Sequence, residues 1–349
     1  MKRLKGIEIL DIITFLITLT ALFLAVSGSI SEYVRPHHFR WIAAANNILP
    51  YTMVISLFIL IYWIVRRSWA LLIPIFSILI NTSTLLSIVQ LRSDSDVLSL
   101  KKEDIIKVFN YNAQEFSSKS GVNIVADISE LILDEAPDII CLQEYKNIAY
   151  PFPEVMKNYF DTIPYRFVEK RGLLHSGLAI FSKYKILKSG LLNLGDNENS
   201  AIWADLNTEQ GVVRIINLQM KINSLSDGKI EIRNLSEKIR LLLDNNEKRA
   251  AQADELKHFI DTTILPIILC ANLNDTPSSY SYIKSKGDKL TDGFREAGSH
   301  FGGTYNGMLE LFRIDYIFHS SEFKSQKYYT IMKDWSDHRP VISELVYQN

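Results

Sequence analysis

Several apolar runs in the second half of the chain end in side chains that could do chemistry. They cover residues 105–112, 138–144, 212–219, 267–275, 313–318 and 336–342, and amides or carboxylates lie at the ends of most of them. One amide after a strand is usually a turn former. Polar groups at the ends of several strands gather on one rim of a sheet, where sites form in layered folds. We therefore expect a site at that rim.

Glu144 is the best candidate for a metal ligand, because its carboxylate ends an apolar run and could hold a hard divalent cation. Asn112 could offer its amide oxygen to the same ion. His338 follows Asp337, and Asp315 could orient its ring, so that His338 serves as a tuned base or a phosphate contact. Such a set suits metal-assisted phosphodiester hydrolysis. Taken singly, Asn112 is equally an ordinary turn residue and Glu144 a solvated rim residue.

The elements that must position these groups are mostly strands. Residues 177–182 and 201–206 add two strand signals, and residues 124–133 and 249–260 carry apolar residues at helical spacing. Pro137 should end the first of these helices. Many strands with a few helices predict a layered α/β domain over residues 105–349, joined through a linker, residues 92–104, to residues 1–91.

The motifs of residues 105–345 resemble those of the endonuclease/exonuclease/phosphatase superfamily, the fold of pancreatic deoxyribonuclease, abasic-site endonucleases, neutral sphingomyelinases and inositol-polyphosphate phosphatases. The matching stretches are the strand that ends at Asn112, CLQE (141–144), SGLAIFSKY (176–184), NDTPSSYSY (274–282), TYNG (304–307), RIDYIFHS (313–320) and SDHRPVI (336–342). The resemblance implies a four-layer α/β sandwich with its site at the strand ends and Mg²⁺ or Mn²⁺ as cofactor. The implied roles are metal binding for Asn112, Glu144 and Asp337, phosphate holding for Asn274, and an Asp–His pair for Asp315 and His338.

Two positions depart from the pattern of this superfamily. Its Gly-Asp-Phe-Asn stretch reads Ala271-Asn272-Leu273-Asn274 here, so an amide stands where the family has the carboxylate beside the attacking water. The strand that normally ends Asn-x-His reads Asn217-Leu218-Gln219, so Gln219 replaces an imidazole. An amide accepts no proton near neutral pH, and a positioned acid or base contributes roughly 10²–10⁴-fold to a rate. Both departures therefore fall on proton transfer.

Three hypotheses follow for the function. The first is a membrane-anchored, metal-dependent phosphodiester or phosphomonoester hydrolase with a degenerate site. The alternative is a catalytically inactive relative that binds a phosphorylated ligand or a partner protein, since amides remain good phosphate binders. A third hypothesis gives the main function to the membrane part and makes the soluble domain a sensor. The apolar runs of the membrane part, described in the next paragraph, carry no charge within their cores. This argues against an ion pathway through them.

The first 91 residues differ in composition from the rest. They hold 10 charged side chains, against 67 in the remaining 258 residues. Three runs lack Asp, Glu, Lys and Arg: residues 12–31, 41–65 and 68–91, of 20, 25 and 24 residues. A membrane-spanning helix needs roughly 20, so we predict three transmembrane helices in a bilayer. Five basic residues before the first run and in the second turn, against three on the other side, favour the N-terminus inside.

We predict an integral protein of a bacterial plasma membrane, with its soluble domain on the outer (periplasmic or extracellular) side. Residues 101–349 hold 30 basic and 34 acidic side chains, so a nucleic-acid partner is not favoured. A phosphate-containing ligand near the bilayer, such as a lipid head group or a lipid-linked phosphate, is the expected partner. Residues 221–249 are charged and helix-prone, which predicts either a solvated insertion or a lid or partner-binding arm. Cys141 and Cys270 lie in apolar runs and are expected to be buried thiols.

Overall fold

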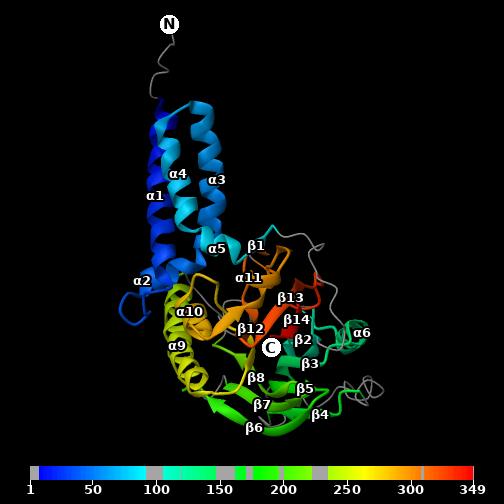
Figure 1. Ribbon diagram of the computed structural model, residues 1–349. Coiled ribbons are helices and arrows are strands. Elements are labelled where there is room, and N and C mark those ends of the chain that lie inside the picture. Colours follow the sequence, from blue (N-terminus) through cyan, green and yellow to red (C-terminus); the bar gives the residue numbers. More distant parts are fainter. Residues whose placement is uncertain are drawn as a thin grey trace.

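The computed structural model describes residues 8–91, 105–118, 120–146, 162–169, 176–195, 200–221, 235–307 and 310–348. A helical unit, residues 8–91, projects from one end of an α/β domain that begins at residue 105 (Figure 1). The predicted linker, residues 92–104, lies outside the described residues. The domain boundaries stay a prediction.

Three helices of the helical unit stand side by side: α1 (Ile9–Ser31), α3 (Leu49–Arg66) and α4 (Leu72–Ile80). A short helix α2 (Arg40–Ala43) and a 3₁₀ turn (Ala44–Asn47) join α1 to α3 at the end nearest the α/β domain. A second 3₁₀ turn (Trp69–Leu71) precedes α4, and α5 (Thr82–Leu86) and strand β1 (Val89–Gln90) follow it. The unit therefore passes three times between its two ends.

Two of the three predicted spans correspond to helices of sufficient length. Among the described residues, α1 with 23 residues and α3 with 18 are long and apolar enough to cross a membrane. The prediction for the third run is not matched, because it forms a shorter apolar helix, Trp69–Ile80, followed by α5. Asn81 separates the two helices, and its side chain donates to the carbonyls of Ala25 and Ser77. The second run also yields a shorter helix, since α3 starts next to Pro50.

Two six-stranded sheets form the centre of the α/β domain. Their strand orders are β10-β12-β9-β8-β7-β6 and β13-β14-β2-β3-β5-β4. The pairs β2–β3 and β8–β9 are parallel, and the other neighbouring strands in these sheets are antiparallel. The strands of the first sheet are β10 (Leu290–Asp292), β12 (Asp315–Ser320), β9 (Ile267–Asn272), β8 (Gly211–Gln219), β7 (Ser200–Thr208) and β6 (Lys185–Asn193). Those of the second are β13 (Phe323–Thr330), β14 (Val341–Tyr347), β2 (Ile105–Asn112), β3 (Ile139–Tyr145), β5 (Gly177–Ser182) and β4 (Tyr165–Val168).

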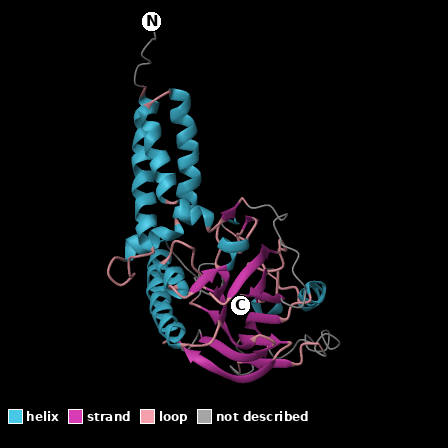
Figure 2. Ribbon diagram, in the orientation of Figure 1, coloured by secondary structure: helices cyan, strands magenta, loops and turns pink. Residues whose placement is uncertain are grey.

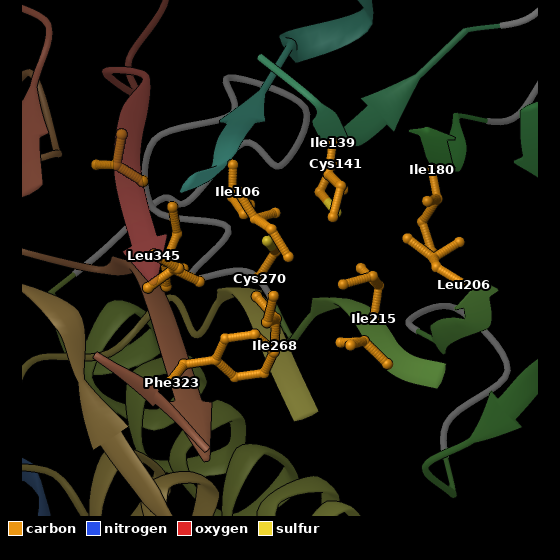
Figure 3. Packing of buried hydrophobic residues seen from close by; sticks show 14 of the residues in the cluster. Ile106, Ile139, Cys141, Ile180, Leu206, Ile215, Ile268, Cys270, Phe323 and Leu345 are labelled. Carbon is orange, nitrogen blue, oxygen red and sulfur yellow. The ribbon is translucent and has the colours of Figure 1, made fainter. Parts of the chain in front are cut away.

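The main core lies between the two sheets (Figure 3). Ile106, Cys141 and Ile180 from the second sheet face Ile215 and Cys270 from the first, and all five are fully or almost fully buried. Strand side chains alternate between faces, so the same strands have a second apolar face that needs its own cover. Both cysteines are free and buried, as the sequence predicts.

Helices cover the outer faces of both sheets (Figure 2). Helix α6 (Val125–Glu135) packs on the second sheet through Ile128 and Ile132. Helices α9 (Leu235–Thr262) and α10 (Tyr280–Lys286) pack on the first through Leu256 and Tyr282. Helix, sheet, sheet and helix thus form the predicted four-layer order. Both predicted helices are confirmed, and α9 begins earlier than expected, inside the predicted insertion; residues 222–234 lie outside the described residues.

A short helix α11 (Gly293–Ala297) and strand β11 (His300–Phe301) lie between β10 and β12. Strand β11 pairs antiparallel with β1 of the helical unit. A 3₁₀ turn (Gln114–Phe116) follows β2. The helical unit is therefore hydrogen-bonded to the α/β domain through backbone as well as side chains.

Candidate functional site

Polar strand ends from both sheets meet at one edge of the sandwich. In the first sheet Asn272 lies opposite Gln219 on one side and opposite Asp315 on the other. In the second sheet Asn112 lies beside Gln143, one residue before Glu144. Residues directly opposite on neighbouring strands share a face, so Gln219, Asn272 and Asp315 project from the same side of the first sheet. The rim expected from the sequence is therefore present.

Glu144 owes its position to an irregularity in β3. The pairing of β3 with β5 shifts register between Leu142 and Tyr145, and Glu144 has a φ of 50°. A β-bulge of this kind redirects a side chain. Its Oε1 accepts hydrogen bonds from Asn112 Nδ2 at 2.9 Å and from Gln219 Nε2 at 2.7 Å. Burial raises the pKa of Glu144, and the bonds from the two amides oppose this rise.

His338 and Asp315 form the expected pair. His338 Nδ1 lies 2.9 Å from Asp315 Oδ2 and 3.1 Å from Oδ1, and both side chains are buried. Burial alone would lower the pKa of His338, but the neighbouring carboxylates, Asp315 first among them, raise it to about 9. The Asp337 carboxylate lies 4.0 Å from His338 Nε2. His338 is therefore an imidazolium at neutral pH, and Asp315 holds the ring at its Nδ1 atom.

The Asn272–Asn274 turn orients one amide and leaves part of another without a partner. Asn272 Oδ1 accepts the backbone N–H of Asn274 at 3.1 Å. The Nδ2 of Asn272 is buried and has no hydrogen-bond partner among the described residues. Asn274 has a φ of 51°, and its Nδ2 donates to the carbonyl of Met220 at 3.0 Å. The amide expected to hold phosphate thus also ties the turn to the end of β8.

A buried amide clamp, defined here as Asn110, Gln143 and Asn217, joins the two sheets beneath the rim. Gln143 Nε2 donates to the side-chain oxygens of Asn110 and Asn217, both at 2.7 Å. Asn217 Nδ2 donates to the carbonyls of Leu142 and Ala179, both at 2.9 Å. The motifs in the sequence do not point to this role. The available signal was one amide in the interior of each of three mostly apolar strands.

The carboxylates of the rim fit a divalent cation better than its amides do. Glu144 has a second oxygen beyond the one that the amides bind, and the charges of Glu144 and Asp337 interact. Magnesium is commonly held by one or two carboxylates plus substrate phosphate. Asn112 fits less well, because its Oδ1 accepts the backbone N–H of Gln114 and its Nδ2 faces Glu144. Across the described part of the chain, no three or more His, Cys, Asp or Glu side chains gather as a metal site.

Comparison with known proteins places this geometry in a family. The model of the Endonuclease/Exonuclease/phosphatase family matches residues 110–338. The chain belongs to this family. Residues 11–88, which make up most of the helical unit, match a domain of unknown function (DUF8431). Among curated protein sequences, no relative matches the chain.

Several solved structures share the fold of the α/β domain. A family protein from Beutenbergia cavernae DSM 12333 is 17% identical, with a TM-score of 0.54 over 70% of this chain and 72% of its own. One from Bacteroides vulgatus is 14% identical, with a TM-score of 0.55 over 70% and 99%. The human Nocturnin catalytic domain, solved with a bound sulfate anion, is 16% identical, with a TM-score of 0.51 over 70% of this chain and 94% of its own. At these identities the likeness shows the fold alone.

The structure brings the predicted site residues to one rim. Asn112, Glu144 and Gln219 are in direct contact, as are Asp315 and His338. The other three, Asn272, Asn274 and Asp337, lie on segments that adjoin these residues. Their catalytic and metal-binding roles stay predictions.

Proposed function

We propose that this endonuclease/exonuclease/phosphatase family member binds a phosphate-containing ligand at the rim and lacks rapid hydrolysis. Asn272 carries the proposal. Its Oδ1 is taken by the Asn274 N–H, while its buried Nδ2 has no partner among the described residues. A buried donor left unpaired costs about 1–3 kcal/mol, and a phosphoryl oxygen would satisfy it.

The chemistry of position 272 separates binding from hydrolysis. A carboxylate there could accept the Asn274 N–H with one oxygen and take a proton with the other. Asn272 makes the same turn but offers N–H donors in place of the second oxygen. Gln219 repeats this exchange, since its Nε2 donates to Glu144 where an imidazole could move a proton. Both amides can bind an oxyanion, and neither can activate water.

The charge of His338 suits the same function. The carboxylate of Asp315 beside it raises the pKa of the ring to about 9, so the protonated ring offers positive charge to a phosphate at neutral pH. Glu144 and Asp337 would hold a divalent cation, which when bound supplies further positive charge to the phosphoryl oxygens. The site then holds phosphate between a cation, an imidazolium and neutral amide donors.

Slow metal-assisted hydrolysis is the second candidate. The Asp315–His338 pair and the Glu144 carboxylate are both in place, although Asn272 and Gln219 are changed. A protonated His338 could give a proton to a leaving group even without a base at position 272. This candidate predicts measurable turnover that depends on Glu144.

The helical unit supports anchoring in a membrane. Its large apolar side chains point outward, and Phe23 and Phe58 are 69% and 67% exposed. Small polar side chains lie inside: Thr18 and Ser56 are buried, and Trp63 Nε1 donates to Thr18 Oγ1 at 2.9 Å. In water this arrangement would be costly, because the large apolar side chains would be exposed to solvent. Lipid would cover the outside, while small and polar residues pack between helices as in membrane bundles.

Membrane anchoring leads to a proposed orientation of the protein and to a proposed class of ligand. The basic residues Arg66 and Arg67 lie at the end of the bundle away from the α/β domain, and basic loops favour the cytoplasmic side. The α/β domain is then on the outer side of a bacterial plasma membrane. A phosphate group on a lipid, or linked to one, would be the ligand within its reach, and the acidic balance of the domain disfavours nucleic acid.

Turnover in the full chain tests both candidates. We expect wild-type protein in bilayer nanodiscs, with Mg²⁺ or Mn²⁺, to cleave bis(4-nitrophenyl) phosphate no faster than its Glu144→Ala variant. The double variant Asn272→Asp with Gln219→His should gain at least about 10²-fold, because it restores two proton-transfer groups. A wild type as fast as the double variant would contradict the proposal and favour the second candidate.

A further inference from the structure

The helical unit touches the segment that carries Asn274, called the site loop here and defined as residues 272–279. Asn46 Nδ2 donates to Asp275 Oδ1 at 2.5 Å. Ser31 Oγ donates to the carbonyl of Ser278 at 2.8 Å. These four residues are all buried. The contact therefore excludes water and lies one residue from Asn274.

The bond from Asn46 has a fixed direction. Asn47 Nδ2 donates to Asn46 Oδ1 at 2.7 Å, which leaves Asn46 Nδ2 as the donor toward Asp275. Asn46 is fully buried in the 3₁₀ turn between α2 and α3. A buried amide with each end matched to a partner holds one orientation. Asn46 thus presents a donor to the carboxylate of the site loop.

Asp275 connects this donor to the rest of the rim. Its Oδ2 accepts from Arg249 Nε of α9 at 3.2 Å, and Arg249 Nη1 also donates to the carbonyl of Lys221, two residues after Gln219. The carbonyl of Asp275 accepts the hydroxyl of Tyr316, the residue next to Asp315, at 2.9 Å. One residue therefore joins the helical unit, α9, the end of β8 and β12.

The site loop needs such support because of its backbone. Asn274 has a φ of 51°, a left-handed conformation that costs energy in a residue other than glycine and persists when its surroundings hold it. Its neighbours on both sides are held by side-chain bonds: Asn272 bonds the N–H of Asn274, and Asp275 Oδ1 bonds the N–H of Thr276 at 3.1 Å. A change at Asp275 would therefore act on the residue that directly follows the Asn272–Asn274 turn.

We propose that Asn46 is a positioning residue for the site loop, so that docking of the helical unit and occupation of the rim by phosphate are coupled. The second half of this statement rests on the proposed phosphate-binding function; the first does not. Coupling between two sites is reciprocal, so a phosphate that favours the docked loop also strengthens the docking of the helical unit.

Hydrogen exchange and phosphate titration of the full chain in bilayer nanodiscs test the proposal. Asn46→Asp places a carboxylate against Asp275, and Asn46→Ala removes the donor without adding charge. Both should speed amide exchange in residues 272–279 and weaken the affinity for inorganic phosphate by about 5–150-fold, the usual range of coupling between sites. Adding Asp275→Asn to Asn46→Asp reverses the donor and acceptor between the two residues, and should restore both readouts in part, because the Thr276 N–H loses its acceptor.

Asn81→Ala is the matched control. Asn81 is an equally buried amide, but its side chain bonds carbonyls inside the bundle. Unchanged exchange in the site loop of Asn46→Ala would overturn the proposal, and so would an equal effect of Asn81→Ala. Amide exchange that is faster in Asn46→Asp, and slower again when Asp275→Asn is added, would support the positioning role. If the wild type then binds no phosphate, the proposed function fails while the positioning role of Asn46 stands.

Discussion

The site differs from the family pattern in the atoms of two side chains. Asn272 keeps a bond to the Asn274 N–H that a carboxylate could also make, and Gln219 uses its NH₂ group to bind Glu144. Each exchange replaces a group that could move a proton with one that donates hydrogen bonds. Removing acid–base groups while keeping donors lowers a rate more than it lowers an affinity.

The Asp315–His338 pair should make stability depend on pH. Its histidine has a pKa of about 9 when folded, against an ordinary value of 6.5. The stabilisation is complete below pH 6.5 and is lost as the pH rises through about 9. We expect the thermal unfolding midpoint of the full chain to fall across this window, and to fall less in Asp315→Asn. Equal slopes in the two proteins would contradict the assignment.

Two local features of the strands build the rim. The β-bulge in β3 turns Glu144 toward Asn112 and Gln219, and the amide clamp holds the two sheets together beneath it. Asn217 belongs to the clamp, and Gln219 at the end of the same strand belongs to the rim. The spacing between the sheets, and with it the contact of Gln219 with Glu144, therefore depends on polar as well as apolar packing.

Removing the clamp should cost stability. Asn217→Ala leaves the carbonyls of Leu142 and Ala179 without its amide donor and takes an acceptor from Gln143. Each buried polar group left unpaired costs about 1–3 kcal/mol, so we expect a loss of at least about 2 kcal/mol in thermal or chemical unfolding.

Asn193→Ala is the comparison for Asn217→Ala, because Asn193 is exposed on β6. A surface substitution of this kind changes stability by about 0.5 kcal/mol or less. Equal losses for the two variants would show that the clamp contributes nothing beyond an ordinary asparagine.

Strand ends and the Asp315–His338 pair were predictable from the sequence, and the other contacts at the rim were not. Apolar runs and family motifs located Asn112, Glu144 and Asp315 because local pattern and burial agree in these strands. The bond between Gln219 and Glu144 joins residues 75 positions apart, and no local pattern encodes it. The break at Asn81 likewise depends on a bond to Ala25 in another helix, so an uncharged run alone could not reveal it.

The whole molecule joins its two parts through many contacts. Arg35 pairs with Asp254, Arg40 pairs with Glu247, Tyr51 packs edge-on against Phe312 at 5.7 Å, and β1 pairs with β11. Helix α9 supplies both acidic partners, and Glu247 among them lies within the predicted insertion, so the described end of that segment contacts the chain's own helical unit. Residues 222–234 lie outside the described residues, so a solvated insertion and a lid or partner-binding arm both stay predictions for the whole segment.

Cysteine labelling would test the proposed orientation in a membrane. We expect Lys183→Cys, on the exposed surface of the α/β domain, to react with a membrane-impermeant maleimide in spheroplasts. Arg67→Cys, at the opposite end of the bundle, should react only after permeabilisation. The native Cys141 and Cys270 are buried and give a low background. Labelling of Arg67→Cys before permeabilisation, with Lys183→Cys protected, would reverse the proposed orientation.

The docking of the helical unit would also fix the distance between the rim and a membrane surface. A catalytic or binding domain on a loose tether sweeps a volume and meets ligands at many distances from its anchor. Here ion pairs, a strand pair and the Asn46–Asp275 bond fix the rim relative to α1 and α3. With those helices in a bilayer, the rim would stay at one distance and one angle from the lipid surface. The protein would then select its ligand by how far the phosphate stands from the membrane as well as by its chemistry.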